Sequence, residues 1–373
     1  MLCDDVDVQG AVEVMTRLRD TAVRDAVPVS GAFDLTYRCN LRCRHCYAGH
    51  LCAQPAGEAA ELGTDDVLRL LAEAADAGCL LLLLSGGEPL LRPDFARIYT
   101  GARRLGMVVT VFTNATLVTE EHLEAFAEYP PQQVEVSLYG VTRATYERVT
   151  GVPGSYARAF SGLERLRERG LRVALKSMIL RENVAEIPAM QRMAQAMGLG
   201  FRCDPLVTPR LDGDPRPLEQ RVDPAMAVAL ELASDRRRDD TLDYVERVGE
   251  VRLGERAYSC GAGLTNFHID PAGVLRPCLA SRELEFEPLR TGFAAAWRAA
   301  VEAVERVRLA AGGACTECAR AAYCGYCPGL FKLETGSFDR PADYVCRLGR
   351  SRDEALHISV IEEDRQLCTR DLA

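Results

Sequence analysis

The sequence of 373 residues predicts an α/β protein, a partial TIM-like barrel of six β/α units, (β/α)6, followed by a small cysteine-rich C-terminal domain. Between residues 32 and 204, short β-like runs alternate with apolar-periodic helices, which indicates a parallel sheet covered by helices. Six units suit a partial barrel rather than a closed eight-stranded one. From Cys260 to Cys346 the sequence becomes cysteine-dense and rich in loops, and we expect metal to substitute there for a hydrophobic core.

The six predicted strands share short apolar or β-branched runs that are bounded by turn residues. They are Ala32–Tyr37, Leu80–Ser85, Val108–Phe112, Val134–Leu138, Val173–Ile179 and Gly200–Asp204. The predicted helices repeat apolar residues at the helical period. They are Thr64–Ala77, Asp94–Leu105, Glu120–Ala127, Ser155–Arg169 and Val184–Met197. Because chemistry in such barrels takes place at the carboxyl ends of the strands, we expect functional residues there.

The composition divides the chain into five segments. Residues 1–31 are expected to form an N-terminal helix and linker, and residues 32–221 the barrel. Residues 222–259 read as a charged helical linker, residues 260–350 as the cysteine-rich domain, and residues 351–373 as a C-terminal tail.

The overall charge and the cysteine content exclude several classes of protein. With 45 basic and 54 acidic residues the net charge is −9, which argues against nucleic acid or an anionic membrane as a partner. The N-terminus has no secretory h-region, and the longest apolar run, Cys79–Leu84, is far short of the ~20 residues that span a bilayer. We therefore expect a cytoplasmic protein, in which 15 cysteines favour metal binding or catalysis over disulfides.

The first cysteine cluster follows the first predicted strand directly. Cys39, Cys43 and Cys46 have the spacing Cys-x3-Cys-x2-Cys. Three thiolates on one loop can bind three irons of a 4Fe–4S cube and leave the fourth iron without a protein ligand. Such an iron can coordinate a substrate or cofactor. The alternative is a zinc site, in which His45 or His50 would be the fourth ligand.

The segment Cys39–Cys46, with the sequence CNLRCRHC, resembles the CxxxCxxC loop of radical S-adenosylmethionine (SAM) enzymes. The resemblance implies that the open iron chelates SAM through its amino and carboxylate groups. One electron from the cluster then cleaves SAM to methionine and a 5′-deoxyadenosyl radical, which abstracts a hydrogen atom from the substrate. His45 stands where the family places an aromatic residue near the adenine; the alternative is a solvated loop histidine.

A second motif of the same family follows the second predicted strand. The residues Gly86, Gly87, Glu88 and Pro89 resemble the GGEP motif, which binds the methionine amino group of SAM. Glycines let a backbone approach a ligand closely, and a carboxylate can pair with an ammonium. Alone, these four residues would also suit an ordinary turn.

Two further strand ends carry residues that match the family. Asn114 lies in Thr113-Asn114-Ala115, which resembles a Thr-Asn-Gly stretch near the SAM site, with alanine replacing glycine. Ser137, at the end of the fourth strand, matches a serine that commonly contacts the ribose, and a plain strand serine is the alternative.

The catalytic residues are unknown from the sequence, and four candidates follow from strand positions. Lys176 lies on the fifth strand among apolar residues, so its ammonium must reach water, a ligand carboxylate or a buried acid. The other candidates are chosen only because they lie near predicted strand ends; they are Tyr139, Asp204 and Arg210.

Seven more cysteines lie in the C-terminal domain. They occur in the order Cys260-x12-Gly-x4-Cys278, Cys315-x2-Cys318-x5-Cys324-x2-Cys327 and Cys346. This order resembles the SPASM extension, found on radical SAM enzymes that modify peptides and proteins. One departure is the pair Cys324 and Cys327, in which two residues intervene where three are expected.

The resemblance implies two auxiliary clusters, and therefore three [4Fe–4S] clusters in the chain. The outer cluster would have four ligands, which are Cys315, Cys318, Cys324 and Cys346. The inner cluster would have three, which are Cys260, Cys278 and Cys327. The inner cluster is therefore left with an open iron or a non-cysteine ligand.

A zinc ribbon is the alternative for this region. Its ligands would be Cys315, Cys318, Cys324 and Cys327. It leaves Cys260, Cys278 and Cys346 unexplained. The remaining cysteines fit no cluster spacing; they are Cys3, Cys52, Cys79, Cys203 and Cys368. We expect Cys79 and Cys203 to be small core hydrophobes. His268 and Asp270 are candidates for acid–base roles, although Asp270 also suits a turn.

The function that this resemblance implies is oxidative modification of a ribosomally synthesised peptide. Thioether or carbon–carbon crosslinking is preferred, with dehydrogenation or epimerisation also compatible. The alternatives are a tetrapyrrole or small-molecule radical SAM oxidase and a formylglycine-generating sulfatase maturase. A redox-sensing metal-binding protein is the alternative that is not an enzyme.

The expected partners follow from that function. They are a peptide substrate and a one-electron donor of the flavodoxin or ferredoxin type. Many peptide maturases carry a winged-helix leader-binding domain before the barrel, whereas about 31 residues precede the first predicted strand here. A separate leader-binding protein is therefore left open.

Overall fold

The computed structural model describes most of the chain: Arg17, residues 20–49, Leu51, and residues 61–233, 235–248 and 253–370. Residues 235–236, 247–248 and 357–370 are described by their backbone alone. Much of the expected N-terminal helix lies outside the described residues, as do Cys3, His50 and Cys52 and the side chain of Cys368.

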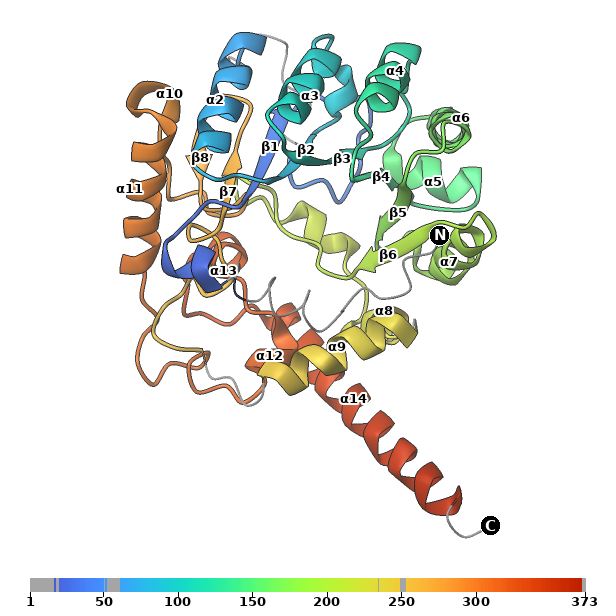
Figure 1. Cartoon of the computed structure of the whole chain (residues 1–373). Coiled ribbons are helices and arrows are strands. Elements are labelled where there is room, and N and C mark those ends of the chain that lie inside the picture. Colours follow the sequence, from blue (N-terminus) through green and yellow to red (C-terminus); the bar gives the residue numbers. More distant parts are fainter. Residues whose placement is uncertain are drawn as a thin grey trace, which may run out of the picture.

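The strands form one sheet in the order β6-β5-β4-β3-β2-β1-β7-β8. Their bounds are β1 Ser30–Thr36, β2 Leu81–Gly86, β3 Val108–Thr113, β4 Gln133–Ser137, β5 Val173–Met178, β6 Gly200–Asp204, β7 Asn266–Ile269 and β8 Leu275–Arg276. All neighbours pair in parallel except β7 and β8, which are antiparallel. Among the described residues the sheet ends at β6 and β8, which do not pair with each other, so the barrel is not closed and the predicted partial barrel is confirmed (Figure 1).

The helices of the barrel cover the outer face of the sheet (Figure 1). They are α2 Thr64–Asp76, α3 Phe95–Arg104, α4 Glu120–Glu128, α5 Arg143–Thr150, α6 Ser155–Glu168 and α7 Ile187–Ala196. Each of the five predicted helices is present, although Val184–Glu186 forms a 3-10 turn before α7. Helix α5 was not predicted. Its sequence cues are Thr142, whose side chain accepts from the Thr145 N–H, and Gly151, whose φ is +68°.

Side chains along each strand alternate between the helices and the inside of the barrel. On β1, Phe33 and Leu35 are buried in the main apolar core with residues of α2 and α3. Residues of the opposite set contact one another across the interior: Lys176 Nζ lies 2.9 Å from the ring centroid of Phe112, and Arg202 stacks over the same ring at 5.6 Å. The inside of the open barrel is therefore polar and charged.

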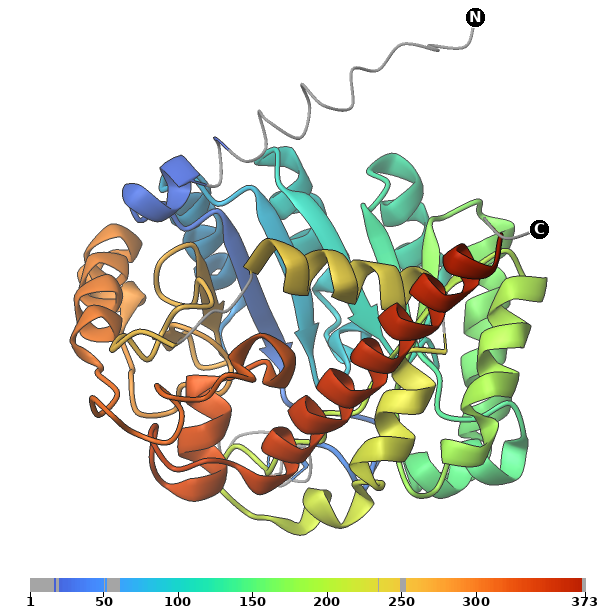
Figure 2. The same ribbon diagram turned by 90° about the horizontal axis from the view of Figure 1, so that it is seen from below.

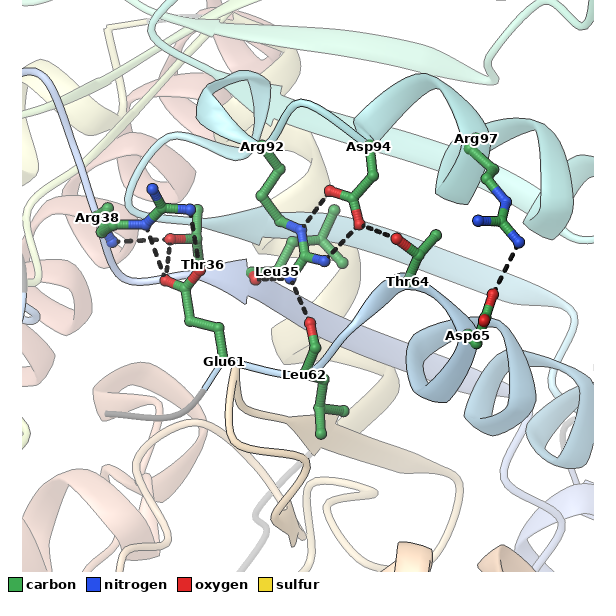
Figure 3. A network of polar contacts seen from close by, with 10 residues as sticks. All are labelled: Leu35, Thr36, Arg38, Glu61, Leu62, Thr64, Asp65, Arg92, Asp94 and Arg97. Atoms are coloured by element: carbon green, nitrogen blue, oxygen red, sulfur yellow. Dashed lines mark hydrogen bonds and ion pairs between the residues drawn. The ribbon is translucent and has the colours of Figure 1, made fainter. Parts of the chain in front are cut away.

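A buried arginine fixes the start of α2 and α3 against β1 (Figure 3). The Arg92 guanidinium donates to the carbonyls of Leu35 and Leu62 at 3.0 Å each and pairs with Asp94 at 2.6 Å. The hydrogen bonds from Arg92 lower the pKa of Asp94 to about 2. Arg92 thus satisfies the Leu35 carbonyl, an acceptor that β1 leaves free near its carboxyl end.

The remaining helices follow the barrel. Their bounds are α8 Pro224–Glu231, α9 Asp235–Val248, α10 Pro288–Thr291, α11 Phe293–Arg306, α12 Ala321–Cys324, α13 Pro328–Thr335 and α14 Asp343–Arg370. Figure 2 shows α9 and α14 crossing the side of the sheet that faces away from the outer helices. On the other side of the sheet, Phe293 and Trp297 of α11 pack their rings against Phe267 of β7 at 4.9 and 6.2 Å.

The expectation that metal substitutes for a hydrophobic core in the C-terminal part was wrong. A second cluster of buried apolar residues forms there around Tyr258, Leu330, Phe331 and Val345. In addition, β7 and β8, which were not predicted, extend the barrel sheet, and Phe267 joins the main core. These contacts tie the cysteine-rich part to the barrel by apolar burial. Over the described part of the chain, we find no helix that combines the length and the apolar character needed to cross a membrane.

We predict that Gly162→Ala lowers the free energy of unfolding by about 1–3 kcal/mol, as overpacking does. A Cβ at Gly162 in α6 would overlap the carbonyl oxygen of Ala115, and this clash outweighs a gain of about 1 kcal/mol in helix propensity. The measurement is urea unfolding. Gly63→Ala is the matched control, because a Cβ there meets open space and φ is −66°. Equal stabilities of the two variants would contradict the prediction.

Candidate active site

The cysteine loop leaves β1 at its carboxyl end. Cys39, Cys43 and Cys46 are all partly buried on it. The Cys46 N–H donates to the Cys43 carbonyl at 3.2 Å, and the Arg42 N–H donates to the Thr150 carbonyl of α5 at 2.8 Å. The unpredicted helix α5 thus anchors the loop that carries the three thiols.

Burial disfavours ionisation of these thiols. It raises the pKa of Cys39 to about 12 and that of Cys43 well above its usual value, and the neighbouring thiols raise both further. Bound cations would reverse this balance, because metals deprotonate the thiols that ligate them. Among the described residues, no three His, Cys, Asp or Glu side chains are arranged to hold a single metal ion. In a [4Fe–4S] cube each thiolate binds a different iron. The three thiols of this loop therefore fit such a cluster better than a single metal ion.

Glu88 is fully buried between the ends of β2 and β3. Its carboxylate accepts from the Thr113 hydroxyl and the Asn114 N–H at 2.7 Å each and from the Leu90 N–H at 3.1 Å. Burial nevertheless raises the pKa of Glu88 to about 7. A carboxylate offers about four lone-pair positions, so three hydrogen bonds leave capacity for one more donor.

The two glycines before Glu88 are required by the protein's own backbone. Gly86 has a φ of +128°, and a Cβ there would overlap the Thr36 carbonyl of β1. A Cβ on Gly87 would overlap the carbonyl of Arg38, and the Gly87 N–H donates to the Thr36 carbonyl at 2.7 Å. Pro89 is buried and begins a 3-10 turn. Close approach of β1 and β2 therefore accounts for both glycines without a ligand.

Asn114 supports the cysteine loop. Its Nδ2 donates to the Asn40 Oδ1 at 3.0 Å and lies 3.9 Å from the Cys39 Sγ. Its Oδ1 accepts from the Thr116 hydroxyl at 2.6 Å. Ala115, the residue that departs from the family pattern, has a φ of +58°, a conformation that favours glycine.

A further ion pair closes the end of β1 (Figure 3). The Glu61 carboxylate accepts from the Thr36 hydroxyl at 2.5 Å and from Arg38 at 3.0 and 3.2 Å. Sequence reasoning missed this contact and the roles of Asn40 and Thr116, because no motif marks their polar side chains.

His45 and Tyr139 form an aromatic pair beside the loop. Their ring centroids are 4.8 Å apart at 63°, and Tyr139 also lies 6.3 Å from Tyr146. Burial lowers the pKa of His45 to about 4, so its ring is neutral, and its Nδ1 has no hydrogen-bond partner in the described structure. Ser137, two residues before Tyr139, pairs in register with Lys176 of β5. His45 is therefore a partly buried side chain at the cysteine loop, and its role beside an adenine stays a prediction.

Of the four catalytic candidates, Lys176 lies in the barrel interior, Tyr139 lies at the cysteine loop, and the Arg210 guanidinium lies beside Gly49, just after that loop. Burial lowers the pKa of Lys176 well below its usual value, although Glu135 opposes this shift. Glu135 itself pairs with Arg202 at 2.6 Å. Two of the candidates have local partners. Asp204 accepts from the Leu206 N–H at 2.7 Å, and Arg210 pairs with its neighbour Asp214 at 3.0 Å.

The C-terminal cysteines gather in two sets. The inner set is Cys260, Cys278 and Cys327, and the outer set is Cys315, Cys318, Cys324 and Cys346. Burial raises the pKa of Cys278 and Cys327, and thiols of the inner set raise it further. Burial likewise raises the pKa of Cys315 and Cys324, each of which is raised further by thiols of the outer set. Thiols of each set are therefore close enough to affect one another's pKa, and their roles as cluster ligands stay a prediction.

Other candidates have structural surroundings. Asp270 accepts from the N–H groups of Ala272 and Val274 at 3.0 Å each, which is the turn considered as its alternative. His268 is buried on β7, with its Nε2 3.1 Å from Asp34 Oδ2. Cys79 and Cys203 pack into the main core, as predicted.

Comparison with known proteins identifies the family. Residues 33–194 match the Radical SAM superfamily. The PqqA peptide cyclase of Rhodopseudomonas palustris is 30% identical over 298 residues, which cover 76% of this chain and 76% of that protein. The chain belongs to the radical SAM superfamily. Its relatives in this superfamily are enzymes, and the family implies a [4Fe–4S] cluster and SAM.

Two relatives match this radical SAM chain more closely over a shorter region. The AdoMet-dependent heme synthase of Methanosarcina barkeri is 35% identical over 167 residues, 45% of this chain and 47% of the relative. The PqqA peptide cyclase of Gluconobacter oxydans is 35% identical over 173 residues, 46% of this chain and 48% of the relative. The chain thus spans about half the length of both.

Solved structures share the fold of the radical SAM chain. Streptococcus suis SuiB bound to precursor peptide SuiA has a TM-score of 0.67 at 16% identity, covering 92% of this chain and 82% of that one. The structure of anSMEcpe with AdoMet and Cp18Cys peptide has a TM-score of 0.67 at 13% identity, covering 91% and 99%. At these identities the likeness establishes the fold alone.

We predict that Glu88 makes the protein less stable as the pH rises. The folded-state pKa of about 7 lies above the ordinary value of 4.5, so the unfolded chain releases the proton first. Stability is therefore lost between about pH 4.5 and 7, by roughly 3 kcal/mol. Glu88→Gln removes this contribution, so the difference in unfolding free energy between wild type and variant should fall with pH. Urea unfolding at about pH 5 and 8 measures it.

Exposed Glu124 on α4 provides the control for this experiment. Glu124→Gln should keep the wild-type pH dependence. The same slope in all three proteins would rule out a buried, protonatable Glu88.

Proposed function

We propose that this chain oxidatively modifies a ribosomally synthesised peptide, with a [4Fe–4S] cluster and SAM as cofactors. The observation that carries the proposal is the buried three-thiol loop at the carboxyl end of β1, which opens onto a polar barrel interior. The PqqA peptide cyclases among the relatives and the structure of SuiB with its precursor peptide support a peptide as substrate. Thioether or carbon–carbon crosslinking is preferred, and dehydrogenation or epimerisation is also compatible.

Residues of this chain supply binding and orientation. Cys39, Cys43 and Cys46 would hold the cluster. When bound, the cluster and SAM supply a carbon radical that takes a hydrogen atom from the substrate. Glu88 keeps capacity for one donor, which suits the ammonium of SAM, and neutral His45 offers a flat ring to the adenine. Gly86, Gly87 and Pro89 hold Glu88 in place.

Other residues of the proposed SAM site orient the cluster ligands or line the barrel interior. Asn114 fixes the orientation of Cys39 through its contact with Asn40. Ser137 ends β4 inside the barrel, where a hydroxyl can reach a ribose. Lys176 and Tyr139 are the proposed catalytic groups. The low pKa of Lys176 suits a neutral amine that accepts a proton from the substrate.

The two C-terminal cysteine sets support two auxiliary clusters. An oxidised cluster at the inner set, which has only three thiols, would take the electron that the modified substrate gives up. The outer set would pass it on. Cys346 of that set is exposed, which suits contact with an electron carrier of the flavodoxin or ferredoxin type.

A tetrapyrrole is the second candidate substrate. The heme synthase of Methanosarcina barkeri favours it, but that match stops at 167 residues, whereas the match with the Rhodopseudomonas palustris peptide cyclase extends over 298. At 76% of the chain, the longer match must extend beyond the barrel into the C-terminal part, where substrate class is set in our proposal. A peptide therefore ranks first.

We predict about twelve irons in each anaerobically reconstituted chain, with cluster absorbance near 400 nm, since a [4Fe–4S] cluster holds four. Replacing Cys39, Cys43 and Cys46 together by alanine should remove about four irons and abolish reductive SAM cleavage. Cys79→Ala, in the apolar core, should keep all of them. A colourless protein with stoichiometric zinc would refute the enzyme and leave a redox-sensing metal-binding protein.

The substrate is tested with a short peptide found to be encoded beside the gene. We predict that reduced enzyme and SAM convert it to a product lacking two hydrogens, read by mass spectrometry, with 5′-deoxyadenosine formed in parallel. Epimerisation would instead leave the mass unchanged and introduce deuterium from heavy water. Consumption of an iron coproporphyrin with no change in the peptide would transfer the proposal to tetrapyrroles. Conversion of a sulfatase cysteine or serine to formylglycine would make the chain a sulfatase maturase.

A further inference from the structure

Strand β6 is a free edge of the sheet, and its outward backbone groups follow from its pairing with β5. The Asp204 carbonyl accepts from the Ile179 N–H at 2.9 Å, so Asp204 faces inward, toward β5. Residues of a parallel strand alternate in direction. Arg202 therefore also faces β5, whereas the N–H and C=O groups of Phe201 and Cys203 face away from the sheet.

These outward N–H and C=O groups have no hydrogen-bond partner in the described part of the chain. Backbone groups of Phe201 and Cys203 take part in no hydrogen bond there beyond the sheet itself. Edge strands in folded proteins are commonly blunted by prolines, bulges or charged side chains. Between Gly200 and Asp204, β6 has no proline, and its register with β5 is regular over all five pairs. The charge of its Arg202 is paired with Glu135 at 2.6 Å. It keeps the pattern that another extended chain can pair with.

A slot of about 590 Å³ encloses this edge. Its lining includes Phe201 from the outer face of the sheet and Arg202 from the inner face, so the slot runs around the edge of β6. The opposite wall is built by Leu230 and Glu231 of α8 and Arg237 of α9. Figure 1 shows α8 and α9 beside β6 on the open side of the barrel. The slot is within the range of about 300–1,000 Å³ typical of ligand sites.

The slot leads directly to the barrel interior. Glu135 and Arg202 line it and form the ion pair of 2.6 Å that spans β4 and β6. Lys176 lies between them on β5 and feels the charge of both. A chain bound along β6 would therefore pass a residue into the chamber that holds the proposed catalytic lysine.

The polar lining favours a peptide over an anionic ring. Three amides, Gln133, Gln191 and Gln195, face the slot and can each donate to and accept from a peptide backbone. The lining carries three acidic side chains, Glu135, Glu231 and Asp240, and two basic ones, Arg202 and Arg237. Glu231 pairs with Arg237 at 3.2 Å. No excess of positive charge is present among the lining residues to attract the propionates of a tetrapyrrole.

We infer that an extended segment of the peptide substrate adds to the sheet beside β6 and occupies this slot. Phe201 and Cys203 bind its backbone, as in other cases of β-strand addition. A segment of about five residues matches the length of β6, roughly 16 Å. This inference rests on the proposed function, since it takes the substrate to be a peptide.

The test removes one outward donor. The probe is an mRNA-displayed library of random ten-residue peptides, enriched on the wild-type holoenzyme. Phe201→Pro deletes the outward N–H and leaves the inward ladder of Arg202 intact, as proline does on edge strands. The enriched peptides should bind this variant about tenfold more weakly than the matched variant Phe201→Val, which loses the same ring but keeps the outward N–H. Equal affinities for the two variants, or a library that yields no binder, would overturn the inference.

If Phe201→Pro fails to fold, hydrogen exchange on the wild-type enzyme still tests the inference. Bound peptide should slow exchange of the Phe201 and Cys203 amides, and slowing confined to other segments overturns the inference. A peptide that is modified without protection of β6 refutes the docking site alone. Protection of β6 by peptides that are never modified refutes the proposed function alone. Dimerisation of the enzyme through β6, seen by native mass spectrometry, would assign the edge to a second copy instead.

Discussion

One buried carboxylate holds the candidate site together. Glu88 follows β2, and its carboxylate accepts from the hydroxyl of Thr113 and the N–H of Asn114 at the end of β3. Asn114 in turn contacts Asn40 and Cys39 on the loop after β1. The orientation of the cysteine loop therefore depends on a chain of polar contacts across three neighbouring strand ends. An acid with two oxygens is the shortest group that can join two of those ends.

When no cation is bound, the same burial disfavours the charged forms of the acid and the thiols at this site. The pKa values of Glu88, Cys39 and Cys43 are all raised, which favours the neutral forms. Charged groups in a low-dielectric site persist only when they are paired. The donors around Glu88 offset part of its desolvation, whereas Cys43 has only other thiols as charged neighbours. Iron would stabilise the thiolates, so cluster binding and the local fold are expected to be coupled.

The sequence predicted the barrel well because apolar residues repeat at one period in its strands and at another in its helices. All six barrel strands lie within two residues of their predicted bounds. The eight-residue α5 was missed because Arg143–Thr150 has few apolar residues at helical spacing. Strand β8 has only two residues, and β7 has four, so neither can show a period. Their place in the sheet is set by pairing with β1, a contact that is distant in the sequence.

The candidate site was predictable where residue type and spacing carry the chemistry. Three cysteines on one loop can be read from the sequence, and so can a Gly-Gly-Glu-Pro turn at the next strand end. The sequence did not show why each of these residue types is required at its position. Gly86 and Gly87 look like a ligand cradle, yet the carbonyls of Thr36 and Arg38 already exclude a side chain from both. Such clashes depend on how closely two strands approach, which no local pattern encodes.

An open barrel separates the routes that the proposed reaction needs. The sheet has one edge at β6 and the other at β8, and Cys278 follows β8 directly. Electrons that leave through the inner cysteine set would therefore depart on the side opposite the β6 slot. Closing the barrel with further strands would cover both edges. In the proposed reaction the incomplete sheet would thus let substrate enter at one side of the interior while electrons leave at the other, and neither route would cross the cysteine loop at the end of β1.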